Sequence, residues 1–356
     1  MLAACGGNGG TSGGAKSLTV YSSGDVNVQD LYNKVIIPAF KKANPGVTVK
    51  FIFSVHSVQD TAMLQRLSAS KQTKSDPPMD VVEGPTKTAA LGRLLTPLTT
   101  TEVPELSKVE PTLEQSVNNQ ALAYRASAVV LAYNSQTVPT PPTTLNDVFT
   151  WIKAHPGRFT YCTPPSGGSG DNFVMTTVLA NMDPATAKSL TTTYDKSLEK
   201  WDKGFALLKS LTPAVYQKHY PNGNQDVLNL LAKGTIWMAP VWSDQSLAAK
   251  RQGLLPAYIK VKQVTSPPFV GSSSYVGVPA NSKHKDLAYK FLRTMMSVPV
   301  QTQVVSQLAG YPGVPIAELP ASVQDAFGDL DTRSMSNGLI LQAENDMKQT
   351  WQNTVP

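Results

Sequence analysis

The sequence has no apolar run long enough to cross a membrane as a helix. A spanning helix needs about 20 consecutive, mostly apolar residues, and no stretch of the 356 residues approaches that length. We therefore expect a mature chain that does not cross the membrane. Only 16% of the residues are charged and 41% are apolar, which is typical of a globular fold. The length exceeds what one hydrophobic core organises and predicts two domains or a large bilobed one.

The sequence also lacks the residue spacings of common catalytic and metal sites. Its four histidines (His56, His155, His219 and His284) are far apart, and no pair has metal-ligand spacing. Residues 167–171 (GGSGD) miss the Gly-x-Ser-x-Gly motif of hydrolases at its last position. We therefore predict no catalytic residue, metal or cofactor. A secreted hydrolase with a triad assembled from distant residues stays an alternative, because chain order does not reveal geometry.

Basic residues are in excess but are not concentrated in one stripe. The formal net charge is +6, and the densest basic clusters lie beside helix-like sequence, at residues 41–42, 250–251 and 283–285. A nucleic-acid surface normally gathers its charge along one face. We interpret these clusters as solvated helix faces and predict no nucleic-acid partner.

Cysteine is rare, and one of the two cysteines is informative. Cys5 follows the small and apolar residues Leu2, Ala3 and Ala4, and residues 6–15 form a Gly-, Ser- and Thr-rich tract that predicts a flexible tether. This site resembles the lipobox of bacterial lipoproteins, although the charged and apolar parts of a signal do not precede it. The resemblance implies lipidation of Cys5 and an extracellular or periplasmic location. A chance cysteine near a disordered terminus is the alternative.

The rest of the chain alternates between strand-like and helical segments. Short β-rich runs at residues 17–21, 47–53 and 79–82 are separated by segments with apolar residues at helical spacing. Pro38 interrupts the first of these helical segments, which predicts a kink or a break. The alternation predicts an α/β fold with a mainly parallel sheet covered on both faces.

Several segments, taken in order, resemble the extracellular solute-binding proteins of bacterial ABC transporters with the type II periplasmic-binding fold. They are residues 21–25 (YSSGD), 79–83 (MDVVE), 124–134 (YRASAVVLAYN), 230–238 (LLAKGTIWM), 275–279 (YVGVP) and 288–292 (AYKFL). Residues 157–173 more loosely resemble the thiamine- and polyamine-type subgroup.

The resemblance implies two α/β lobes joined by two crossover strands. The first lobe would comprise residues 17–124 and 272–356, with C-terminal helices that partly bridge the lobes, and the second would comprise residues 125–271; residues 1–16 would form the lipobox remnant and tether. The crossovers near residues 123–130 and 272–276 would act as the hinge. A monomer that delivers a small molecule to an ABC permease, touching the membrane only through its lipid, is the implied function. A sensor lipoprotein on the same fold is an alternative.

The ligand site of open α/β sheets lies beyond the carboxyl ends of the strands, where this sequence carries small and polar residues. The candidate ligand-binding residues are Ser22, Ser23, Gly24, Asp25, Glu83, Ser166, Gly167, Gly168, Ser169, Asp171, Trp242, Asp244 and Tyr275. Residues 166–170 precede a helix, whose free N–H groups would favour an oxygen-bearing group. A glycine-rich N-cap turn without a ligand is an equal alternative for this loop, and Asp171 can simply cap the helix.

The carboxylates and aromatic rings among these residues predict an organic cation, polyamine- or thiamine-like, as the ligand. Carbohydrate is the alternative, because tryptophan stacks on sugar rings and acids accept hydrogen bonds from hydroxyl groups. Trp237 would also supply a ring, but a residue at its position within a strand is more often part of the core.

Overall fold

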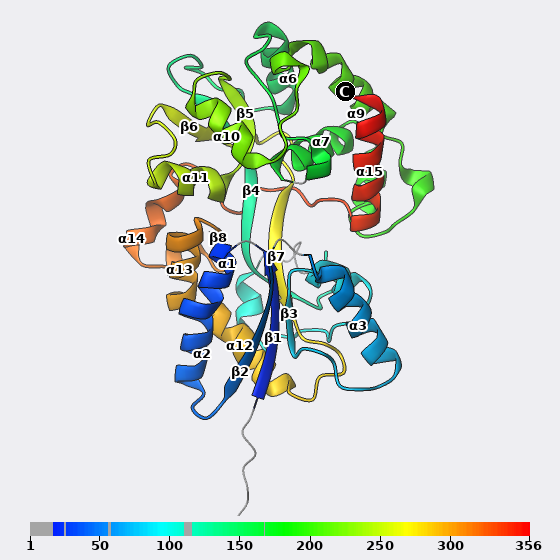
Figure 1. Cartoon of the computed structure of the whole chain (residues 1–356), viewed down its shortest axis with the longest axis vertical. Helices are drawn as coiled ribbons and strands as arrows, with labels where there is room; N and C mark the ends of the chain where they lie inside the picture. Colours follow the sequence, from blue (N-terminus) through cyan, green and yellow to red (C-terminus); the bar gives the residue numbers. More distant parts are fainter. Residues whose placement is uncertain (1–16, 25, 56–57, 110–115, 167) are drawn as a thin grey trace, which may run out of the picture.

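The computed structural model describes residues 17–24, 26–55, 58–109, 116–166 and 168–356. Figure 1 shows two lobes stacked along the long axis of the molecule, with strands β4 and β7 running between them. Within the described part of the chain, every helix is too short or too polar to span a bilayer. The mixed α/β architecture confirms the predicted fold class. The prediction of a mainly parallel sheet was wrong, because most of the strand pairs are antiparallel.

The first lobe is built on a small parallel sheet. Strand β1 (Ser17–Gly24) pairs in parallel with β2 (Thr48–Val55) on one side and β3 (Val81–Glu83) on the other. Helices in this lobe are α1 (Val26–Leu31), η1 (Tyr32–Ile36), α2 (Ile37–Ala43), α3 (Asp60–Gln72), α4 (Thr86–Leu91), η2 (Pro104–Lys108), α12 (Lys285–Met295) and α13 (Val298–Leu308). Because β1, β2 and β3 are parallel, their carboxyl ends meet at the edge that faces the second lobe (Figure 1).

The predicted interruption near Pro38 takes the form of a π-helical turn. Residues Tyr32–Ile36 form η1, and Pro38 is the second residue of α2, which follows without a gap. Proline lacks the N–H that an interior helical residue donates, and the change from π-helical to α-helical spacing falls next to it. The helix is therefore continuous in direction but changes its hydrogen-bond spacing.

Two strands carry the chain between the lobes. The first half of β4 (Leu122–Asn134) pairs antiparallel with β7 (Gly271–Gly277), and its second half pairs with β5 (Met238–Trp242) and β6 (Ile259–Lys262). Strand β7 also pairs with β3. The sheet order is β2-β1-β3-β7-β4-β5, so one hydrogen-bonded surface continues from one lobe to the other.

The second lobe packs helices around β5, β6 and the second half of β4. Its elements are α6 (Leu145–Ala154), η3 (Pro164–Ser166), α7 (Ser169–Ala180), α8 (Pro184–Ser189), η4 (Lys196–Leu198), α9 (Asp202–Leu211), η5 (Thr212–Ala214), η6 (Tyr216–Lys218), α10 (Asn224–Ala232) and α11 (Ser243–Arg251). Thr144 caps α6 by accepting a hydrogen bond from the Asp147 N–H at 3.1 Å. Trp237 precedes β5 and is half-buried beneath the Arg158 guanidinium.

The C-terminal segment crosses between the lobes a third time, where the resemblance implied C-terminal helices that partly bridge the lobes. After β8 (Tyr311–Pro312), η7 (Ile316–Glu318), α14 (Ala321–Gln324) and η8 (Asp325–Phe327), the chain passes to α15 (Leu341–Thr354). Although the predicted division places residues 272–356 in the first lobe, α15 packs on the second (Figure 1). Its buried Trp351 packs against Tyr161 and Tyr220 and donates to the Tyr161 hydroxyl at 3.1 Å.

Candidate functional site

The first turn of α7 is fixed by contacts that only small residues permit. A Cβ on Gly170 would lie 1.7 Å from the Cys162 carbonyl oxygen, so this position accepts glycine alone. Gly168 has a φ of 93°, a conformation that favours glycine. The Ser169 N–H and hydroxyl both reach Asn224 Oδ1, at 2.9 and 3.0 Å. These contacts anchor the start of α7 and thereby place Asp171, two residues further on.

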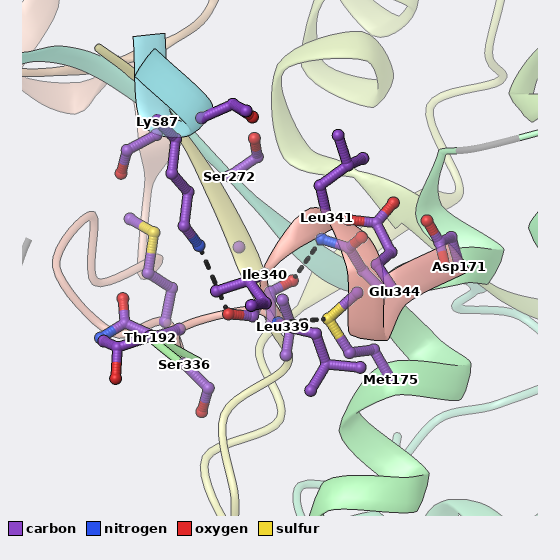
Figure 2. A pocket seen from close by; sticks show the side chains of 18 of the residues that line it. Lys87, Asp171, Met175, Thr192, Ser272, Ser336, Leu339, Ile340, Leu341 and Glu344 are labelled. Carbon is purple, nitrogen blue, oxygen red and sulfur yellow. Dashed lines mark hydrogen bonds between the residues drawn. The ribbon is translucent and has the colours of Figure 1, made fainter. Parts of the chain in front are cut away.

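A cavity of about 640 Å³ lies between the lobes. The first lobe contributes Lys87, Thr88 and Leu91 from α4. The second lobe contributes the first two turns of α7, and β7 forms part of the wall from residue 271 to residue 275. The third crossing, residues 335–342, completes the lining (Figure 2). The cavity is therefore lined by both lobes and by two of their connections, β7 and the third crossing.

Two carboxylates and one ammonium gather on the second-lobe side of the cavity. Lys348 Nζ lies 2.9 Å from Asp171 Oδ2 and also pairs with Glu344. Asp171 is buried, and its Oδ1 has no hydrogen-bond partner among the described residues. Burial raises the pKa of Asp171 to about 8, the neighbouring Glu344 charge adds to the rise, and Lys348 opposes it. Lys348 thus pairs with both carboxylates, and Asp171 Oδ1 has no donor among the described residues.

Lys87 approaches the cavity from the opposite lobe. Its Nζ donates to the Gly338 carbonyl oxygen at 3.4 Å, a long contact drawn in Figure 2. Burial lowers the pKa of Lys87, and the more distant Glu344 opposes this shift. Figure 2 shows Lys87 on one side of residues 339–341 and the pair Asp171 and Glu344 on the other.

Aromatic and uncharged polar groups make up much of the remaining wall. Trp242, at the end of β5, and the buried Tyr275 of β7 supply rings. Hydroxyl and amide groups come from Thr192, Ser272, Ser336, Asn337 and Gln342. Such walls combine ring surface with hydrogen-bonding groups that orient a small ligand.

Four of the predicted ligand-binding residues line this cavity, namely Gly168, Asp171, Trp242 and Tyr275. Ser23, Gly24, Ser166 and Ser169 lie outside its lining. Ser23 donates to Asp60 Oδ2 at 3.0 Å, Ser166 donates to the Thr163 carbonyl oxygen at 2.7 Å, and Gly24 ends β1. Cys5, Asp25 and Gly167 fall outside the described residues.

The predicted residues Ser22, Glu83 and Asp244 belong to a buried polar network along the hinge rather than to the cavity wall. Glu83 accepts hydrogen bonds from Ser22 and from the Tyr124 hydroxyl, and Arg125 lies 3.5 Å from it. Further along β4, Ser127 donates to Asp244 at 2.7 Å. Burial raises the pKa of Glu83 and Arg125 opposes the rise. The network connects β3, β4 and the start of α11 across the two lobes.

Lys87, Glu344 and Lys348 were not predicted as site residues. Glu344 and Lys348 have i,i+4 spacing on α15, which in a sequence indicates an ordinary exposed ion pair. Lys87 stands in a short helix after a strand without any distinguishing motif. Only the third crossing brings α15 to the cavity, and no signal in the sequence announces that path.

The described residues show neither a metal-ligand cluster nor an activated thiol. Within the described ranges, no three His, Cys, Asp or Glu side chains gather where they could hold a metal ion. The buried thiol of Cys162 accepts the Gly170 N–H at 3.1 Å, and burial raises its pKa, so it is a poor nucleophile. The cavity is a polar enclosure, lined from both lobes, that can hold a small molecule.

Solved structures of solute-binding proteins share this fold over nearly their whole length. An extracellular solute-binding protein from Bordetella parapertussis superposes with a TM-score of 0.77 at 16% identity, covering 96% of this chain and 99% of that one. The Atu4243-GABA receptor gives a TM-score of 0.67 at 18% identity, with coverage of 95% and 97%. The spermidine/putrescine ABC transporter substrate-binding protein PotD from Streptococcus pneumoniae gives 0.65 at 14%, with coverage of 96% and 100%.

Sequence comparison agrees with the structural comparison. No curated protein matches the chain in sequence. The family described as bacterial extracellular solute-binding protein matches residues 36–327, which is most of the chain. Because the match covers both lobes and the strands between them, it confirms the resemblance noted in the sequence: the chain belongs to the bacterial extracellular solute-binding proteins.

Proposed function

We propose that this solute-binding protein captures a small molecule bearing a protonated amine and delivers it to an ABC importer. Solute-binding proteins of ABC importers bind a small ligand and interact with the permease. The proposal adds the class of ligand, which is the organic cation that the carboxylates and rings of the sequence predicted.

The unpaired oxygen of Asp171 is the observation that carries this proposal. A buried carboxylate is costly unless a cation or hydrogen-bond donors compensate it. Here Lys348 is shared between Asp171 and Glu344, and Asp171, which lines the cavity, has a buried Oδ1 without a donor among the described residues. A ligand ammonium has three donors and a full positive charge, and would supply what this oxygen lacks.

The rings of Trp242 and Tyr275 in the cavity wall support the same ligand class. An organic cation is attracted to the face of an aromatic ring in addition to its carboxylate partners. Two structural neighbours, the Atu4243-GABA receptor and the spermidine/putrescine protein, are also named after amines. At 14–18% identity these neighbours share only the fold, so the residues of the cavity carry the argument.

A thermal-shift screen with matched solutes tests this function. Polyamines, thiamine and amino acids should raise the melting temperature, and oxyanions should not. A ligand at about one hundred times its Kd stabilises the folded state by roughly 2.7 kcal/mol. In the Asp171→Asn variant, the shift should shrink for the same ligand. Stabilisation by oxyanions or neutral sugars, with none by amines, would contradict the proposed class.

Carbohydrate is the second candidate, favoured by the uncharged part of the wall. Trp242 offers a ring face, and Ser272, Asn337 and Gln342 offer groups that both donate and accept hydrogen bonds to hydroxyls. Neutral mono- and disaccharides in the same screen separate the two candidates, because a sugar needs no counter-charge and its binding should survive Asp171→Asn better than that of an amine.

We also propose that a lipid on Cys5 holds the protein at the outer face of the membrane and that it works as a monomer. The Leu2-Ala3-Ala4-Cys5 sequence and the Gly-rich tract after it support the anchor. In cells that express the chain behind a complete signal peptide, radiolabelled palmitate should enter the wild type and not Cys5→Ser. Equal labelling of both would contradict the anchor.

A further inference from the structure

Lys87 brings a positive charge to the cavity from the first lobe. It lies in α4, and among the described residues its Nζ reaches only the Gly338 carbonyl oxygen, at 3.4 Å. It forms no ion pair with a carboxylate in the described part of the chain. An ammonium has three donors, so most of its capacity is open to a ligand. Burial lowers the pKa of Lys87 by more than the Glu344 charge raises it, which agrees with a cation that has no carboxylate in direct contact.

The opposite wall of the cavity lacks positive charge and hydrogen-bond donors for its carboxylates. Asp171 Oδ1, in the second lobe, has no hydrogen-bond partner among the described residues, and Glu344 shares Lys348 with Asp171. The cavity therefore offers an uncompensated cation on one lobe and an undersatisfied carboxylate on the other.

When all four of its acidic and basic side chains are charged, as they would be with a ligand ammonium at Asp171, the charges of the cavity wall add up to zero. Its charged side chains are Lys87 and Lys348, with positive charge, and Asp171 and Glu344, with negative charge. A solute with one positive and one negative group leaves this enclosed site neutral. A diamine would add two positive charges that nothing in the wall compensates, and unpaired charges in a desolvated site are costly.

We propose that the solute is bipolar, with an ammonium held by Asp171 and Glu344 and an acid group held by Lys87. This inference rests on the proposed function and narrows it from amines in general to amino acids and similarly built compounds. Because its two charged ends contact different lobes, such a solute stabilises the closed arrangement, whereas a simple amine contacts the second lobe alone. Only interactions that differ between the open and closed states shift their populations.

Matched four-carbon probes test the inference on the unmodified protein. Isothermal titration calorimetry compares 4-aminobutanoate, 1,4-diaminobutane and butanoate, with the corresponding sets of three, five and six carbons and the common α-amino acids. We expect at least one amino acid to bind about tenfold or more tightly than the diamine and the acid of the same length. Equal or tighter binding of the diamines would overturn the bipolar ligand and leave the proposed function standing.

A charge-removing variant gives an independent measurement. Lys87→Met keeps an unbranched side chain, one atom shorter and without charge. We expect it to weaken binding of the tightest-binding amino acid by at least about tenfold, while the diamine of equal length binds as well or better. Lys41→Met, on the exposed surface of α2, is the control and should change neither. Parallel losses for both probes in Lys87→Met would overturn the role of Lys87. If no amine in the panel binds the wild type, both the inference and the proposed amine class fail.

Discussion

Asp171 is buried by the packing of α7, yet its carboxylate is only partly compensated by neighbouring groups. The helix α7 begins beside Cys162, and that close approach buries the first turn and the carboxylate with it. Lys348 compensates Asp171 only in part, because Glu344 competes for the same ammonium. A group under such conditions stabilises the ligand-free protein best when it is protonated. Binding-site polarity is thus maintained at the expense of stability, as is common at functional sites.

This partial compensation predicts a pH dependence of stability. The pKa of Asp171 rises from 3.8 to about 8 in the folded protein. A raised folded-state pKa stabilises the fold below pH 4, and this contribution is lost as the pH rises toward 8. Asp171→Asn, which cannot ionise, should therefore gain stability relative to the wild type by on the order of a few kcal/mol between pH 5 and pH 8.5. Urea unfolding of the ligand-free protein at both pH values measures this difference.

The exposed carboxylate of Asp329 provides the control for this comparison. Asp329→Asn should track the wild type at both pH values, because a surface substitution away from other groups changes stability little. If Asp171→Asn differs from the wild type by the same amount at pH 5 and pH 8.5, Asp171 does not titrate in this range, and its environment is better compensated than the contacts indicate.

Among the helices and strands, α15 contributes most to the site that the sequence alone did not predict. Ala343, Met347 and Trp351 form its buried face against the second lobe, while Glu344 and Lys348 turn toward the cavity. The helix therefore joins the third crossing to the second-lobe core and brings two charges to the ligand site. One element serves both packing and recognition.

Truncating the anchor of this helix should destabilise the protein. Trp351 is 3% exposed and contacts Tyr161 and Tyr220. We expect Trp351→Ala to lower the free energy of unfolding by about 3–5 kcal/mol, the usual range for a large buried aromatic residue. Asn345→Ala, on the exposed face of the same helix, should change it by less than about 0.5 kcal/mol. Guanidinium unfolding followed by circular dichroism compares the two, and similar small losses would show that α15 is not an integral part of the second lobe.

Local signals predicted the elements well and their assembly less completely. The β-rich run that became β4 and the Thr144 cap of α6 are encoded by neighbouring residues, because strand propensity and capping act over a few positions. Asp171 and Trp242 were reachable because the ends of strands and the starts of helices converge in this type of fold. The contribution of Lys87 and Glu344 depends on a contact between positions more than 250 residues apart, which no local pattern determines.

The predicted residues Ser22 and Glu83 illustrate the opposite case. They stand at strand ends, as ligand-binding residues often do, but Arg125 of β4 reaches back to Glu83 and the pair is buried in the hinge. A sequence places polar residues near the cleft, whereas the partner that each one selects depends on the strands beside it. In this chain β3 lies beside β7, and β7 beside β4, so Glu83 meets Arg125.

The whole molecule is arranged for a change in the relative orientation of its lobes. Strands β4 and β7 and the third crossing are the connections, and the cavity is lined from both lobes (Figure 1). Closure of two lobes around a ligand requires few backbone changes when they occur in such connecting segments. Contacts made by Lys87 from one side and Asp171 from the other would exist together only when the lobes approach.

Small-angle X-ray scattering, with and without the solute that binds most tightly, tests this account most directly. We predict a smaller radius of gyration for the wild type at saturating solute, and no change for Asp171→Asn at the same solute concentration. A radius that stays constant while calorimetry shows the wild type to be saturated would contradict binding by closure of the two lobes.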